Sequence, residues 1–243
     1  MTNRRLLTVA LAVAALATVL IGCASAGATA PERTYRVTLT NLTDGQPFSP
    51  GVIATHRPNT GLFSVGELAH PPIEAIAEDG NEAPAVAALS SLDGITDIFD
   101  LGHPLTPSGK TVGTFSDSVT FEIQARPGDR LSVVTMLICT NDGFTGLDSG
   151  HLPAHGSRVF MLNSYDAGTE DNTEESVDIV DPCSGLGPVP LAGDPDGNDE
   201  AGVDSDPHVA ISHHPGIAGG SDLSPSEHGW TDPVAMLTVE RIN

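Results

Sequence analysis

The chain has 243 residues and carries 32 Asp and Glu against 10 Lys and Arg, a formal net charge of −22 at pH 7. A field this negative repels polyanions, which argues against a nucleic-acid partner and suits divalent cations or a high-salt environment. The length is that of one β-rich domain or two small ones.

The first residues have the pattern of an export signal. Arg4 and Arg5 precede an uncharged run over residues 6–21 that is short for a membrane span. The run ends in LIGC, which resembles the cleavage box of bacterial lipoproteins, so we expect lipid on Cys23. An ordinary signal peptide cleaved after Ala26 is the alternative. In either case the protein is expected to be exported.

The lipoprotein interpretation divides the chain into a signal peptide over residues 1–22, a small polar tether over residues 23–33 and a domain over residues 34–243. The lipid would attach the domain to the membrane, on the outside of the cell or in the periplasm. Without the two leader arginines, 8 Lys and Arg remain against 32 Asp and Glu, and the net charge becomes −24.

Two further cysteines, Cys139 and Cys183, remain once Cys23 carries lipid. In an oxidising compartment we expect one disulfide between them, and two separate buried thiols are the alternative. The bridge would close a loop that contains the acidic stretch YDAGTEDN, residues 165–172.

The elements follow in chain order from the hydrophobic pattern. Residues 34–42 alternate between apolar and polar side chains, which predicts a half-buried strand. Alanine-rich segments with breakers at both ends predict short helical turns near residues 73–81 and 83–92. Strands return at residues 118–125 and 130–140, joined by the tight turn RPGD. Further strands are expected at residues 52–56, 158–163, 176–180, 208–212 and 233–242.

About eight strands with Gly/Pro-rich connections predict an all-β fold, a single antiparallel β-sandwich. The segment 184–207 is rich in Gly, Pro and Asp and is expected to be a long acidic loop. Its DPDGNDE run resembles a calcium loop only superficially, because its glycine is the fourth residue and flanking helices are lacking. A second, weak cation site at residues 194–206 stays open.

The stretch YDAGTEDN crowds three carboxylates into six positions, Asp166, Glu170 and Asp171. A solvated acidic turn is one interpretation. The other is a cation site, where oxygen ligands gather because the ion neutralises their repulsion.

Several stretches together resemble the spondin N-terminal domain, a family of extracellular matrix proteins and bacterial exported proteins. The resemblance spans residues 35–242, and its motifs are TNLTDGQPFSPGVIATH, LFSVGELAHPPIEAIAEDGN, MLICTNDGFTGLD, YDAGTEDN, HPGI and GWTDPVAMLTVERI. It implies an eight-stranded antiparallel sandwich similar to C2 domains, with Ca²⁺ held by acidic loops at one end.

Transferred residue by residue, the resemblance assigns the metal ligands to Asp142 of NDGF and to Asp166 and Glu170 of DAGTE. The chain departs from the animal members at Glu170, where they have Asp, and at Gly143, where they have an aromatic residue. Asp148 and Asp171 are spare oxygen ligands nearby.

Nine histidines raise an enzyme alternative. The chain has no HExxH or GxSxG motif, and most of the histidines are scattered, so ordinary polar roles are expected. A zinc hydrolase using His213 and His214 is the open possibility. Trp230, the single tryptophan, is interpreted as a packing residue.

The sequence thus predicts a calcium-binding, envelope-anchored extracellular adhesion or ligand-binding domain without catalytic activity. Its ligand would be a glycan, a protein or a lipid surface. A metal-dependent or carboxylate-based hydrolase is the alternative, and a purely structural envelope protein is a third possibility.

Overall fold

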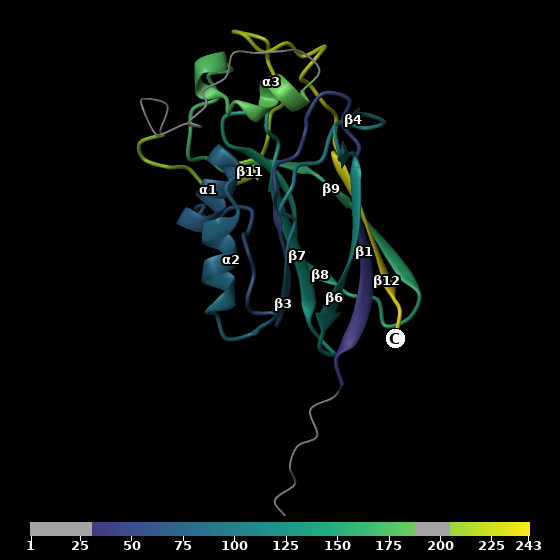
Figure 1. Ribbon diagram of the computed structural model, residues 1–243. Helices are drawn as coiled ribbons and strands as arrows, with labels where there is room; N and C mark the ends of the chain where they lie inside the picture. The colour runs from purple at the N-terminus through teal and green to yellow at the C-terminus, as the bar shows by residue number, and fades with distance from the viewer. Residues whose placement is uncertain (1–30, 188–204) are drawn as a thin grey trace, which may run out of the picture. The chain divides into compact units, whose positions relative to one another are not determined.

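The computed structural model describes residues 31–187 and 205–243. The described strands form two main antiparallel sheets that pack face to face (Figure 1). The expected leader, lipidation site and most of the tether lie outside the described residues, as does most of the acidic loop, including most of residues 194–206.

The first sheet has the strand order β6-β1-β12-β9. Its strands are β1 (Arg33–Asn41), β6 (Ser118–Ala125), β9 (Ser157–Leu162) and β12 (Ala235–Arg241). Alternation along β1 buries Tyr35, Val37 and Leu39 against the second sheet, as the period-two pattern predicts.

The second sheet has the order β11-β10-β8-β7-β2-β3. Its strands are β2 (Val52–His56), β3 (Ile95–Asp100), β7 (Arg130–Met136), β8 (Gly143–His151), β10 (Ser164–Asp166) and β11 (Ser212–His213), while β4 (Thr111–Val112) and β5 (Phe115–Ser116) form a separate hairpin. Strand β2 is buried along its whole length, because both faces of this sheet are covered.

Helices α1 (Pro71–Asp79) and α2 (Ala83–Ser90) cover the outer face of the second sheet (Figure 1). Ile73, Ile76 and Ala77 of α1 lie in the same hydrophobic cluster as Val52 and Val134 of the sheet. Helix α1 ends at Gly80, which has a left-handed φ of 63° and lies so close to Ser49 that a Cβ would approach its Cβ to 2.7 Å. The two predicted helical turns are therefore real helices.

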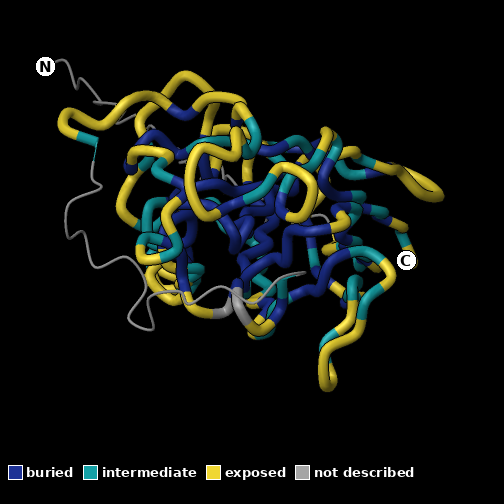
Figure 2. Tube along the Cα trace, turned by 90° about the horizontal axis from the view of Figure 1, so that it is seen from above, coloured by how far each residue is buried: buried dark blue, intermediate teal, exposed yellow. Residues whose placement is uncertain are grey.

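Three hydrophobic clusters follow from this layering, and the buried segments run through the centre of the domain (Figure 2). The largest lies between the two sheets, and the second lies between the second sheet and the helices. The third surrounds the disulfide and includes Met136, Ile138 and Leu223. None of the helices in the described part of the chain has the length and apolar character needed to cross a bilayer.

Three predicted strands differ in the structure. Of residues 208–212, only Ser212 lies in a strand, β11, and Ala210 forms an isolated bridge with Leu68. Residues 176–180 do not form a strand, because Ser176–Asp178 is a 3-10 helix (η1) in which the backbone N–H of Ser176 donates to Asp222. The strand expected at residues 130–140 ends at Met136, and the next residues leave the sheet toward the disulfide. A short helix, α3 (Pro182–Leu186), carries the second cysteine.

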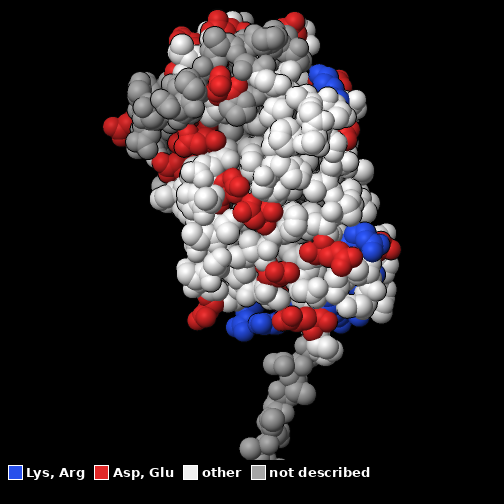
Figure 3. Space-filling model, viewed as in Figure 1, with Lys and Arg blue, Asp and Glu red and all other residues white. Residues whose placement is uncertain are grey.

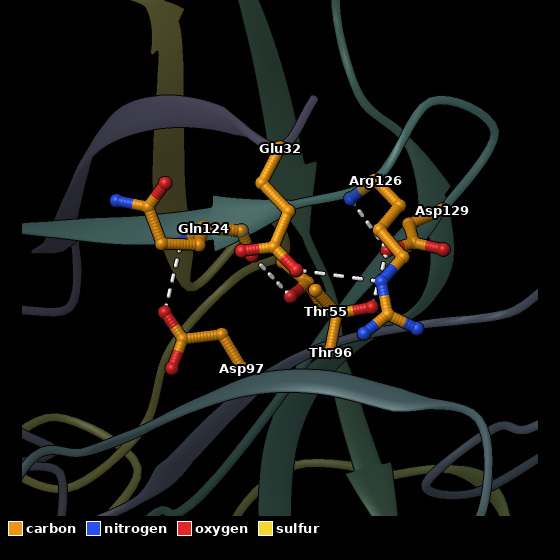
Figure 4. A network of polar contacts seen from close by, with 7 residues as sticks. All are labelled: Glu32, Thr55, Thr96, Asp97, Gln124, Arg126 and Asp129. Carbon is orange, nitrogen blue, oxygen red and sulfur yellow. Dashed lines mark hydrogen bonds and ion pairs between the residues drawn. The ribbon is translucent and has the colours of Figure 1, made fainter. Parts of the chain in front are cut away.

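Side chains from the other sheet occupy the free edge of β6 at Gln124, near the end of the strand (Figure 4). The backbone N–H of Gln124 donates to Asp97 (2.8 Å), and its carbonyl accepts from the hydroxyl of Thr55 (2.5 Å). Within the β6–β7 turn, Asp129 accepts from the backbone N–H of Arg126 and from the hydroxyl of Thr96. These contacts join the two sheets along one side.

His56, the last residue of β2, makes stability depend on pH. The side chain is buried, and its ring nitrogens bind the Arg57 carbonyl (2.8 Å) and the Ser132 hydroxyl (2.7 Å). Burial lowers the pKa of His56, so the unfolded state binds the proton more readily. This contribution is fully present above the unfolded pKa of about 6.5 and is lost as pH falls below it.

We expect His56→Gln to reduce the loss of unfolding free energy between about pH 8 and about pH 5, the range in which histidine titrates. Urea unfolding at several pH values measures this slope for both proteins. Glu78 and Asp142, whose raised pKa values act in the opposite direction, are common to both and cancel in the comparison. Parallel pH profiles would show that His56 does not carry the effect.

Candidate functional site

The three residues assigned by the resemblance meet at one end of the sandwich. Asp142 lies in the turn between β7 and β8, and Asp166 ends β10. The antiparallel pairing of β10 with β8 places Asp166 opposite Gly143, directly beside Asp142. The backbone N–H of Glu170 then donates to Asp142 (3.1 Å), which brings the third residue into the same corner.

Asp142 is the centre of this corner. Its side chain is fully buried, and Oδ2 accepts from the backbone N–H groups of Thr169 (2.9 Å) and Glu170 (3.1 Å) and from the Thr169 hydroxyl (3.3 Å). Oδ1 has no hydrogen-bond partner among the described residues. Burial, and then the nearby charge of Asp166, raise the pKa of Asp142 to about 6, although the hydrogen bonds oppose the shift. A buried carboxylate oxygen without a donor is a position that a cation can fill.

Unlike Asp142, Asp166 has hydrogen bonds to both carboxylate oxygens, and the donors belong to its own turn. Oδ1 accepts from the backbone N–H of Gly168 (2.9 Å) and Oδ2 from the amide of Asn172 (2.7 Å). Gly168 has a φ of 72°, and a Cβ there would lie 2.5 Å from the Val209 carbonyl oxygen, so this position requires glycine. The loop is therefore fixed by its own contacts.

Gly143, where the resemblance leads one to expect an aromatic residue, is also explained by close packing. A Cβ at this position would lie 2.5 Å from Oγ1 of Thr140. That hydroxyl accepts from the Gly143 N–H (2.9 Å) and donates to the Leu137 carbonyl (2.6 Å). The turn that carries Asp142 is built on this threonine, so it leaves no room for a side chain.

The carboxylates gather in one corner without forming a closed shell. Within residues 31–187 and 205–243, no three His, Cys, Asp or Glu side chains are close enough to hold a metal ion. Glu170 is buried, and Asp148 and Asp171 are exposed and bind serine hydroxyls instead. The observation that fits a cation is therefore the free oxygen of Asp142 rather than a preformed cage.

Two buried carboxyl groups beside this corner were not predicted. Glu78, near the end of α1, is buried, lies beside the Thr169 side chain and is affected by the charge of Asp142. Burial raises the pKa of Glu78 to about 7. Its place in the helical period is outside the apolar face formed by Ile73 and Ile76, so the pattern did not indicate burial.

Glu174 is the second of these groups and organises the adjoining loop. Its carboxylate accepts from three consecutive backbone N–H groups, those of Ala218 (2.5 Å), Gly219 (2.7 Å) and Gly220 (3.2 Å). Its own backbone has a φ of 57°, which is unusual for a residue with a side chain. The C-terminal loop is thereby attached to the segment that follows YDAGTEDN.

The histidines do not assemble a zinc centre. Nδ1 of His214 accepts from the backbone N–H of Gly216 (3.0 Å), so in the neutral ring Nε2 carries the hydrogen and has no lone pair for a metal. Burial lowers the pKa of His214, which favours this neutral form. His213 is exposed and its ring contacts Tyr165.

Trp230 is a packing residue, as interpreted from the sequence. It lies against the inter-sheet core, its Nε1 donates to the Ser164 hydroxyl (2.9 Å), and its ring contacts His214 with centroids 5.0 Å apart.

The predicted disulfide between Cys139 and Cys183 is present, and both cysteines are fully buried. It joins residues 44 positions apart, and the loop that it closes contains Asp142, Asp166 and Glu170. The alternative of two separate thiols is wrong.

The domain is an antiparallel β-sandwich whose acidic corner lies within a loop closed by a disulfide. Because disulfides persist in oxidising compartments, this is a domain of the exported class. The family model described as Spondin_N matches residues 38–180, more than half of the chain. The chain belongs to the spondin N-terminal domain family, and all three assigned residues lie within the match. A search of curated proteins finds no match. The family and the disulfide together indicate an extracellular, adhesion-type domain.

Proposed function

We propose that this chain is a calcium-binding adhesion or ligand-binding domain, held at the cell envelope by lipid on Cys23 and without catalytic activity. Asp142, Asp166 and Glu170 would hold the ion, which would supply the positive charge that this corner lacks. The observation that carries the proposal is the fully buried Asp142 with an unpartnered Oδ1.

The charges around the corner support a cation. The three ion pairs within the described residues all involve Arg36 or Arg126, near the opposite end of the sandwich. Among the described residues, no lysine or arginine forms an ion pair with Asp142 or Asp166. Buried like charges without a counter-charge destabilise a fold, so binding of a divalent ion would stabilise this end.

The same geometry argues against a carboxylate hydrolase. A general acid with a raised pKa is common in such enzymes, and Asp142 and Glu78 both have one. Their side chains are 0% and 5% exposed, so a substrate does not reach them. The shifts follow from burial and suit a structural ion site better than acid–base chemistry.

Calorimetric titration of calcium into chelator-treated protein tests the proposal. We expect saturable binding of about one ion per chain, lost in Asp142→Asn and in Asp166→Asn. Excess calcium at about 100 times the dissociation constant should stabilise the parent by about 2.7 kcal/mol and leave both variants unchanged.

The matched control is Asp171→Asn, which removes the same charge from the same loop and should keep calcium binding. Without calcium, Asp142→Asn should be at least as stable as the parent, because it removes a buried charge. Binding that survives in both site variants would make YDAGTEDN an acidic turn only.

A further inference from the structure

The basic side chains of the domain are gathered at one end. Arg33 begins β1 and pairs with Ala125 at the end of β6, while Tyr35 pairs with Arg241 at the end of β12. In the second sheet Arg130 pairs with His56, so the β6–β7 turn lies at the same end. We call this the arginine end, and its members are Arg33, Arg36, Arg57, Arg126, Arg130, Arg158 and Arg241.

The candidate calcium site lies at the other end, where β7 ends and β8 begins. Lys110, the single lysine, donates to the Asp44 carbonyl beyond the end of β1 and does not belong to the arginine end. Figure 3 shows most of the blue side chains of this face in its lower part, where red side chains lie beside them, and further acidic side chains over the middle and upper parts. The basic side chains of the domain are thus concentrated at one end of the strands, whereas acidic side chains occur at both ends.

These arginines are solvent-accessible, although Arg130, Arg158 and Arg241 donate to backbone carbonyls of neighbouring loops. Arg36 pairs with Glu122 (3.4 Å) and Glu240 (3.6 Å), and Arg126 pairs with Glu32 (3.4 Å). The other five make no ion pair within the described residues, and none of the seven is buried. Carboxylates are interspersed here, but two of them, Asp97 and Asp129, already accept internal hydrogen bonds (Figure 4).

We propose that the arginine end is the surface that the domain turns toward an anionic lipid bilayer, with its guanidinium groups binding headgroup phosphates. Guanidinium binds phosphate through two parallel hydrogen bonds. A negatively charged lipid surface attracts arginines within a Debye length, about 8–10 Å, and repels the acidic remainder of the domain. Attraction of the arginines and repulsion of the acidic remainder both turn the arginine end toward the bilayer.

The position of the chain start agrees with this orientation. Cys23 lies ten residues before Arg33, where β1 begins. Ten residues span at most about 35 Å when fully extended, so a lipid on Cys23 would keep the arginine end near the bilayer. This orientation in the cell rests on the proposed lipid anchor on Cys23. In this orientation the candidate calcium site, at the other end of the strands, faces away from the membrane.

The disulfide makes a direct test possible. With Cys139 and Cys183 joined, Cys23 is the single free thiol of the chain that begins there, so it can be coupled to a maleimide phospholipid. Hydrogen exchange is then measured on vesicles of phosphatidylcholine alone and of phosphatidylcholine with phosphatidylglycerol. Coupling makes the result independent of lipidation in the cell, which mass spectrometry of the native protein tests separately.

We expect slower exchange in the β6–β7 turn, residues 126–129, and in the β8–β9 loop, residues 152–156, on the anionic vesicles alone. The protection should be lost at about 1 M salt, where the screening length is about 3 Å. It should also be lost in the triple variant Arg57→Gln/Arg130→Gln/Arg158→Gln and retained in Lys110→Gln. A thermal melt of each variant checks that the fold is intact.

Several results would overturn the proposal. These are equal exchange on both kinds of vesicle, protection that persists in the triple variant, and protection of the loops around Asp166 instead. Protection by a soluble polyanion such as heparin, without protection by anionic vesicles, would assign the arginine end to a polyanion and not to the membrane.

Discussion

Replacing Cys139 and Cys183 together by alanine is expected to lower the free energy of unfolding by about 4 kcal/mol. The two cysteines are 44 residues apart, and a cross-link of that span removes loop-closure entropy of this size from the unfolded chain. Both cysteines also lie in the third hydrophobic cluster with Ile138 and Val180, so their loss loosens that packing. Urea unfolding under non-reducing conditions measures the difference.

Alanine is preferred to serine in this double variant because both positions are fully buried and an unpaired hydroxyl would add its own cost. The control is the parent protein under reducing conditions, which should lose a similar free energy while keeping both side chains. If the double variant matched the oxidised parent, the bridge would contribute nothing and the loop would be held by packing alone.

Replacing Phe144 by alanine is expected to cost about 3–5 kcal/mol, as for other large buried aromatic residues. Its ring is fully buried and packs edge-on against Phe63 with centroids 5.1 Å apart, and Tyr165 lies 5.5 Å away. Phe144 follows Asp142 by two residues and pairs with Tyr165, the neighbour of Asp166. The cavity would therefore open directly below the candidate site.

Denaturant unfolding of Phe144→Ala beside Phe144→Leu measures this cost, because leucine fills much of the space and should lose about 1 kcal/mol. A second control is Val159→Ala on β9, where the side chain is 52% exposed and the expected change is within about 0.5 kcal/mol. A Phe144→Ala protein as stable as the Val159→Ala protein would mean that the aromatic cluster relaxes without a cavity.

The elements that could be predicted from sequence are those whose burial alternates. Strands β1, β6 and β12 each bury one face, and their period-two pattern is plain in the sequence. Strand β8 was missed because its sequence, GFTGLDSGH, is rich in glycine and polar residues. It becomes a strand because β7 and β10 supply hydrogen-bond partners on both sides, a tertiary effect that local pattern does not reveal.

The site was predictable only through the family resemblance. Asp166 and Glu170 share a short acidic stretch, but Asp142 lies 24 residues before Asp166 and is joined to it by strand pairing. Glu78 and Glu174 approach from a helix and a loop whose local patterns carry no sign of burial. Calcium binding itself stays a prediction, since Oδ1 of Asp142 is open to a cation but the described residues form no preformed cage.

The closed edge of β6 has a consequence for molecules displayed side by side at high density. A sheet grows by adding a strand to free backbone donors and acceptors. At Gln124 these groups are already occupied by Asp97 and Thr55, and the N–H of Arg126 is occupied by Asp129. A neighbouring copy that approaches this edge meets charged side chains and satisfied backbone. A strand from a crowded neighbour therefore cannot pair with β6 at Gln124, next to the β6–β7 turn.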